Sequence, residues 1–141
     1  MIIMAIDFGH VRTGVAVSDA TELLASPVGT VTERKDEVLL KKLAVIAKER
    51  RAEMLVVGLP RNMDGSCGDS AKRCEALGNA LGEMTGLPVT MWDERLTTVS
   101  AIGYLNQTDT RGKKRKAVVD TVSAVIILED YLRRRKNGIG L

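Results

Sequence analysis

The apolar residues of this chain follow two different periods, and the changes between them predict a mixed α/β fold. Nearly continuous apolar runs at 2–8, 53–60 and 88–92 have the length of strands that are covered on both faces. Between these runs, 35–51 and 70–85 carry apolar residues at helical spacing, with charged residues on the remaining positions. The pattern therefore predicts strands that alternate with helices and form a sheet with helices on its faces.

The first part of the chain predicts strands that are joined directly, without a helix between them. The turn-forming segment GHVRTG at 9–14 separates the first apolar run from a second short strand at 15–18. This close spacing is typical of a hairpin. A third strand is predicted around Pro27, in the segment PVGTVT. The first three strands are therefore expected to pair antiparallel.

The last part of the chain predicts two helices. A short helix follows the fifth strand and ends near Asn106, and a long apolar helix runs from about Ala117 to Arg135. The segment 108–116 between them is predicted as a basic loop. The complete order is βββαβαβαα, which indicates an α/β fold with a mixed five-stranded sheet flanked by helices. We expect a single domain over 1–141.

Composition excludes several classes of protein. The chain is 45% hydrophobic and 28% charged, as in ordinary globular proteins, and no apolar stretch approaches the length of a membrane span. We therefore expect a cytoplasmic protein that does not bind a membrane. The two cysteines, Cys67 and Cys74, have the spacing of neither a redox motif nor a zinc half-site. Cys74 is expected on the buried stripe of its helix with Leu77, Leu81 and Met84, and Cys67 in a loop.

Asp7 is a carboxylate in an unexpected place. It interrupts the apolar run 2–8, which otherwise predicts a strand at the centre of the sheet. A lone charge at such a position costs several kcal/mol unless another group compensates it. Taken alone, Asp7 could be a hydrogen-bonded structural residue, and the sequence must be searched for partners.

Two further acids lie in comparable surroundings. Glu94 stands two residues past the fifth strand, and the carboxyl ends of parallel strands are where ligand sites gather. Asp120 falls on one face of the last helix with Ala124, Ile127 and Tyr131, a face turned toward protein. Separately, Glu94 could be a helix N-terminal acid and Asp120 could pair with an arginine.

A shared divalent cation would explain all three acids together. If Asp7, Glu94 and Asp120 converge, they repel one another strongly unless a cation lies between them. Mg²⁺ and Mn²⁺ prefer oxygen ligands and keep positions open for water and phosphate. The pattern thus indicates metal-assisted hydrolysis of a phosphodiester, with the three acids as metal ligands and catalytic residues.

Clustered basic charge points to a polyanionic partner. The net charge is +3 and the pI about 9.0, but 111–116 reads RGKKRK and 133–136 reads RRRK. The second run complements the negative end of the last helix. The four aromatic residues are scattered, so a nucleic acid would be held by its backbone. The candidate phosphate contacts are Arg12, Arg61, Arg95, Arg111, Lys113, Lys114, Arg115 and Lys116.

Four segments in this order carry a family resemblance. DFGHVRTGVAVSD, VVGLPRNMDGS, VTMWDERLTTV and KKRKAVVDTVSAVIILEDYL resemble the YqgF (RuvX) family, within the RNase H-like superfamily that includes RuvC resolvases. The resemblance extends from about Ile3 to Leu132. It implies an RNase H-like fold, a nuclease that uses Mg²⁺ or Mn²⁺, and a metal site formed by Asp7, Glu94 and Asp120. His10 departs from the family pattern, in which threonine is common at this position.

The resemblance also implies a substrate and leaves alternatives open. The family is associated with maturation of the small-subunit ribosomal RNA precursor, which makes precursor RNA and ribosomal particles the expected partners. Its earlier proposed role, Holliday-junction resolution on branched DNA, would require a homodimer rather than a monomer. A non-catalytic nucleic-acid-binding module is a third reading. A phosphate-binding ATPase of the actin or sugar-kinase type is disfavoured, because 141 residues supply only one of the two domains that enclose a nucleotide.

Overall fold

The computed structural model describes residues 1–60, 68–94 and 112–138, and within 112–121 it describes the backbone helix but not the side chains. The elements are β1 (Ile3–Asp7), β2 (Arg12–Ser18), β3 (Ala25–Thr32), α1 (Asp36–Glu49), β4 (Met54–Leu59), α2 (Asp69–Thr85), β5 (Val89–Asp93) and α4 (Gly112–Lys136). Each corresponds to a predicted element in the predicted order. The short helix predicted to end near Asn106 lies outside the described residues.

The five strands form one mixed sheet in the order β3-β2-β1-β4-β5. β1 pairs antiparallel with β2 and parallel with β4, and β5 pairs parallel with β4. The predicted antiparallel arrangement of the first three strands is confirmed, since β2 also pairs antiparallel with β3. β1 is the central strand, so its carboxyl end lies between two neighbours.

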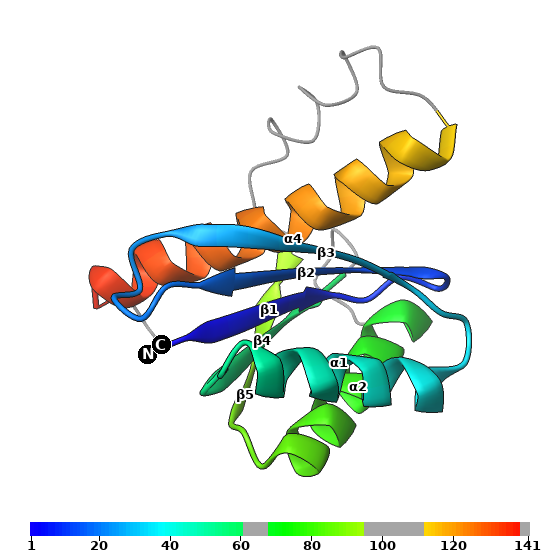
Figure 1. Cartoon of the computed structure of the whole chain (residues 1–141), viewed down its shortest axis with the longest axis horizontal. Coiled ribbons are helices and arrows are strands. Elements are labelled where there is room, and N and C mark those ends of the chain that lie inside the picture. The colour runs from blue at the N-terminus through cyan, green and yellow to red at the C-terminus, as the bar shows by residue number, and fades with distance from the viewer. Residues whose placement is uncertain (61–67, 95–111, 139–141) are drawn as a thin grey trace.

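Helices cover both faces of the sheet, as Figure 1 shows: α4 lies on one face, and α1 and α2 lie on the other. Met4 and Ile6 of β1 belong to the core under α1 and α2, whereas Ile3 and Ala5 belong to the core under α4. Because successive side chains of a strand point to opposite faces, Asp7 belongs to the α4 face.

Aromatic packing fixes α4 on the sheet. Trp92 of β5 meets Tyr131 of α4 edge to face, with ring centroids 5.8 Å apart and an interplanar angle of 88°. The Arg134 guanidinium lies over the Trp92 ring at 5.4 Å, within range of a cation–π contact. The Tyr131 hydroxyl donates to the sulfur of Met54 at 3.6 Å. These contacts set the position of α4 relative to the end of β5.

The start of the last helix differs from the prediction. α4 begins at Gly112 rather than near Ala117, so the basic residues Lys113–Lys116 belong to a helix and not to a loop. The expectation was wrong because a basic run was taken as a loop signal. Lysine and arginine are good helix formers, and no proline interrupts the sequence from 112 to 136.

The buried stripe of α2 is confirmed except at its end. Cys74, Leu77 and Leu81 are buried, but Met84 is 49% exposed. Met84 lies in the last turn, two residues before Gly86, which ends the helix in a left-handed conformation with φ 72°. Helical periodicity assigns Met84 to the buried face of α2, but it does not show whether the sheet extends far enough to cover the last turn of the helix.

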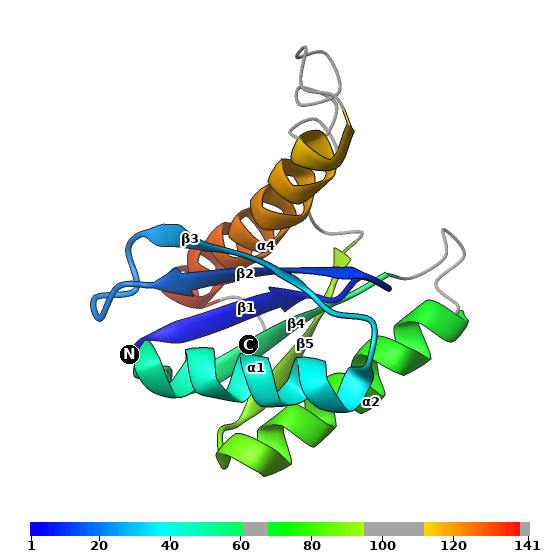
Figure 2. The same ribbon diagram turned by 45° about the vertical axis from the view of Figure 1, so that its right-hand side comes forward.

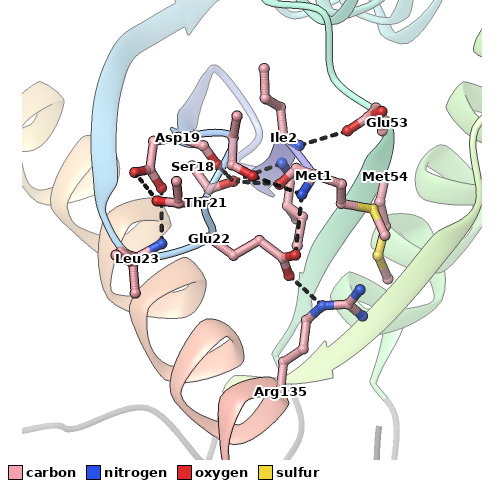
Figure 3. Close-up of polar contacts among 12 residues, drawn as sticks. Met1, Ile2, Ser18, Asp19, Thr21, Glu22, Leu23, Glu53, Met54 and Arg135 are labelled. Carbon is pink, nitrogen blue, oxygen red and sulfur yellow. Dashed lines mark hydrogen bonds and ion pairs between the residues drawn. The ribbon is translucent and has the colours of Figure 1, made fainter.

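The β2–β3 turn is held by a network of polar contacts (Figure 3). The turn follows the end of β2 that pairs with the start of β1, whereas Asp7 is at the other end of β1. The Asp19 carboxylate accepts hydrogen bonds from the Thr21 hydroxyl and from the amides of Leu23 and Leu24. Glu22 pairs with Arg135 of α4 and with the N-terminal amine. The basic run 133–136 was predicted to complement the negative end of the last helix, and the structure shows that one of its residues, Arg135, also forms a specific ion pair.

Replacing Glu22 by glutamine should lower stability only modestly and only at higher pH. Burial opposes ionisation of Glu22, but hydrogen bonds from the N-terminal amine and Arg135 still hold its pKa below the ordinary value of 4.5. A lowered folded-state pKa stabilises the protein above the unfolded pKa, and the contribution is lost as pH falls through the folded pKa. We expect Glu22→Gln to cost at most about 1 kcal/mol at pH 7 and nothing near pH 2. Urea unfolding at both pH values measures this, and an equal cost at both would contradict it.

Candidate active site

Asp7 ends the central strand, and glycines stand on both sides of it. In the antiparallel pairing of β1 with β2, Asp7 lies opposite Gly14. In the parallel pairing with β4, Ile6 aligns with Val57, so the next residue of β4, Gly58, lies beside Asp7. Asp7 itself is only partly buried. Neither glycine places a side chain of its own beside Asp7 on the α4 face.

Glu94 fills part of the space that Gly58 leaves. A Cβ atom at Gly58 would lie 2.7 Å from Oε1 of Glu94 and 2.7 Å from Cδ1 of Ile127. The Glu94 carboxylate therefore reaches from the end of β5 across β4, on the α4 face. Since Asp7 stands on the other side of Gly58, the structure brings these two predicted site residues together.

The position of Asp120 follows from the direction of α4. Tyr131 contacts Met54 at the start of β4, and Ile127 reaches Gly58 near its end, so α4 runs antiparallel to β4. Asp120 lies on the stripe that includes Ile127 and Tyr131, seven residues before Ile127, or about 10 Å along the axis. This places its backbone toward the end of the sheet where β1 and β4 end. The Asp120 side chain lies outside the described residues.

The described side chains supply two of the three predicted ligands. Among those side chains no group of three histidines, cysteines or acids is close enough to hold a metal. The donor set nevertheless fits a hard cation, because the Glu94 carboxylate lies over Gly58, the residue of β4 beside Asp7, where a side chain would obstruct it. A third carboxylate would complete the site from α4.

The negative charge of the site affects the pKa of the nearby Cys74 thiol. Burial, the largest cause, and the negative charges of Glu94 and Asp7 together raise the pKa of its thiol to about 11, although the positive charge of Arg73 opposes them. The thiol is 2% exposed and is protonated at neutral pH, which confirms the prediction of a core cysteine. The predicted loop residue Cys67 lies outside the described part of the chain.

The predicted phosphate contacts are only partly described. Arg12 lies at the start of β2 and is partly buried. Lys113, Lys114, Arg115 and Lys116 lie in the first turns of α4, and nothing is described of their side chains. Arg61, Arg95 and Arg111 lie outside the described residues. His10 is exposed in the turn between β1 and β2.

Sequence reasoning missed Arg73 and the two site glycines. The Arg73 guanidinium donates to the carbonyl of Gly9 at 3.1 Å and to Asp36 at 2.8 Å, and so ties the turn after Asp7 to α1. Nothing in the spacing of α2 distinguishes Arg73 from a solvated arginine. Gly58 did carry a signal, because a glycine inside a strand often marks a close approach by another group.

The comparisons with known proteins place this chain in a family. Residues 1–134 match the family described as "RuvX: Holliday junction resolvase". The chain belongs to the RuvX family. A protein of Lachnospira eligens named "Putative pre-16S rRNA nuclease" is 40% identical over 139 residues, which cover 96% of this chain and 99% of the relative. A protein of Desulfitobacterium hafniense with the same name is 43% identical over 140 residues, covering 98% and 97%.

Solved structures confirm the fold of this RuvX chain. T. thermophilus RuvC in complex with a Holliday junction substrate matches with a TM-score of 0.64 and 12% identity, over 99% of this chain and 98% of that one. The Fowlpox virus resolvase in complex with Holliday junction DNA matches with a TM-score of 0.52 and 8% identity, over 96% and 99%. The predicted RNase H-like α/β fold and the nuclease assignment are both confirmed. Within the described residues, no helix is long and apolar enough to cross a membrane.

Proposed function

We propose that this RuvX nuclease hydrolyses phosphodiester bonds with Mg²⁺ or Mn²⁺ held by Asp7, Glu94 and Asp120. The observation that carries the proposal is the approach of Glu94 to Gly58, beside Asp7. Two carboxylates that converge at this position repel each other, and they also repel the phosphates of a nucleic acid. A protein that only bound nucleic acid would bear this electrostatic cost without benefit. This argues against the non-catalytic binding module.

The residues of the chain have separate tasks in this mechanism. When bound, a divalent cation supplies Lewis-acid activation of water and neutralises charge on the scissile phosphate. Asp7 is the most rigid ligand, because the strand that carries it is paired on both sides. Glu94 is oriented through Trp92, two residues earlier, which is locked against Tyr131. Arg12 and the basic N-terminal turns of α4 would hold the phosphates that flank the cleaved bond.

The proposed substrate is the precursor of 16S ribosomal RNA, cleaved in maturation of its 5′ end. The names of two close relatives and the scarcity of aromatic residues for base stacking support an RNA bound through its backbone. We further propose that the enzyme works in the cytoplasm, on RNA that ribosomal particles present. Cleavage of four-way DNA is the second candidate, because the family description and the RuvC complex name that substrate. It requires a dimer with two active sites.

One assay separates these substrates. The purified protein is incubated with single-stranded RNA that spans the 5′ junction of the precursor and, separately, with a four-way DNA junction. Each reaction contains Mg²⁺, Mn²⁺ or EDTA. We expect cleavage of the RNA in both metals and none in EDTA. Symmetric cutting of the junction alone would favour the resolvase, and cleavage that persists in EDTA would contradict the metal site.

A further inference from the structure

A basic pocket lies beside the turn that follows Asp7. It has a volume of about 500 Å³, is open to solvent and is lined from the β1–β2 turn, the start of α1 and the first turns of α2. Figure 2 shows these three backbone segments near one another, at the right of the view. Most of its lining residues are positively charged or can become so. The lining residues are His10, Arg34, Lys35, Asp36, Glu37, Val38 and Arg73.

Ion pairs offset the charge of two acids in and beside the pocket, Asp36 and Glu33. Asp36 pairs with Arg73 at 2.8 Å, and this pair fixes the wall of the pocket that also holds the Gly9 carbonyl. Glu33 pairs with Lys42 and accepts hydrogen bonds from backbone amides, so its charge is directed away from the pocket. The remaining lining acid, Glu37, offsets one of the two positive charges of Arg34 and Lys35, whose side chains are exposed. The pocket therefore presents net positive charge.

We infer that this pocket binds a phosphate group of the nucleic-acid substrate, close to the scissile phosphate but distinct from it. The inference rests on the proposed nuclease function. His10 is three residues from Asp7, which limits the distance between their α-carbons to about 11 Å. A strand cleaved at Asp7 can thus place a neighbouring phosphate against the turn. Guanidinium, ammonium and imidazole groups all donate to phosphate oxygens, and no phenylalanine, tyrosine or tryptophan lines the pocket.

The pocket is separable from catalysis because it lies on the α1 and α2 side, whereas Asp7 belongs to the α4 face. The test uses the double variant Arg34→Ala/Lys35→Ala, which leaves Arg73 and the turn intact. The matched control is Lys41→Ala/Arg50→Ala, which removes the same charge from exposed positions of α1 and its end, outside the pocket. RNA affinity is measured by fluorescence anisotropy at several salt concentrations. We expect the pocket variant to bind RNA about tenfold more weakly. The slope of log affinity against log salt concentration should fall by about 0.7, the value for one phosphate of a single strand.

His10 provides a local probe, because it is the only histidine of the chain. Its imidazole proton signal in NMR should move when the wild-type protein is titrated with micromolar RNA. Inorganic phosphate at the same concentration should leave it in place, and so should RNA added to the pocket variant. The inference is overturned if pocket and control variants bind RNA equally well, or if RNA leaves the His10 signal unchanged while the wild type still cleaves RNA. That result leaves the nuclease function standing, whereas a wild type that neither binds nor cleaves nucleic acid overturns both.

Discussion

Asp7→Asn is expected to lower the rate of metal-dependent RNA cleavage by about 10³-fold while leaving the protein folded. Loss of one carboxylate from a cation site removes several kcal/mol of transition-state stabilisation, and each 1.4 kcal/mol corresponds to a factor of ten in rate. Asparagine keeps the size of the side chain, so the pairing of β1 with β2 and β4 should be unaffected. The measurement is single-turnover cleavage at saturating Mg²⁺, together with Mn²⁺ affinity by calorimetry.

The stability of Asp7→Asn distinguishes a metal ligand from a structural acid. Asp7 and Glu94 lie on either side of Gly58, so removing one charge also removes repulsion between them. Without metal, the variant should be at least as stable as the wild type, and added Mn²⁺ should stabilise only the wild type. Glu83→Gln, an exposed position of α2, is the control and should retain full activity. A metal-free Asp7→Asn protein that unfolds well below the wild type would instead indicate a structural role for Asp7.

Gly58→Ala is expected to lower the cleavage rate by about 10²-fold, although it adds only a single uncharged methyl group. That methyl would lie 2.7 Å from Oε1 of Glu94 and from Cδ1 of Ile127, so Glu94 must move. A displacement of about 1 Å in a catalytic group costs about this factor in rate. Mn²⁺ affinity should fall with the rate, because the same carboxylate is displaced.

The control for Gly58→Ala is the same substitution on the opposite face of the sheet. A methyl group at Gly78 of α2 would lie 2.9 Å from Cε of Met91 and 3.0 Å from Cγ2 of Val57. Both variants overpack the core and should lose about 1–3 kcal/mol of stability in urea unfolding. Only Gly58→Ala should lose activity and metal affinity. Equal losses of activity in both variants would show that general destabilisation, rather than displacement of Glu94, causes the effect.

Much of the fold could be predicted because it depends on local patterns. The two-faced apolar runs of β1 and β4 and the helical spacing of α1 and α2 each specify an element from adjacent residues. The prediction was wrong where local signals compete. The basic run 113–116 was taken for a loop, although its residues also favour a helix, and α4 in fact begins at Gly112.

The sequence by itself determined that Asp7 lies in a central strand and that Glu94 follows a parallel strand, because both facts depend on neighbours along the chain. It also indicated that the two acids share a site, but it did not show which contacts bring them together. Only the tertiary structure decided that Gly58 separates them and that Arg73 holds the turn after Asp7. Those contacts join residues far apart in the sequence, and their geometry depends on strand register and helix packing, which no local period specifies.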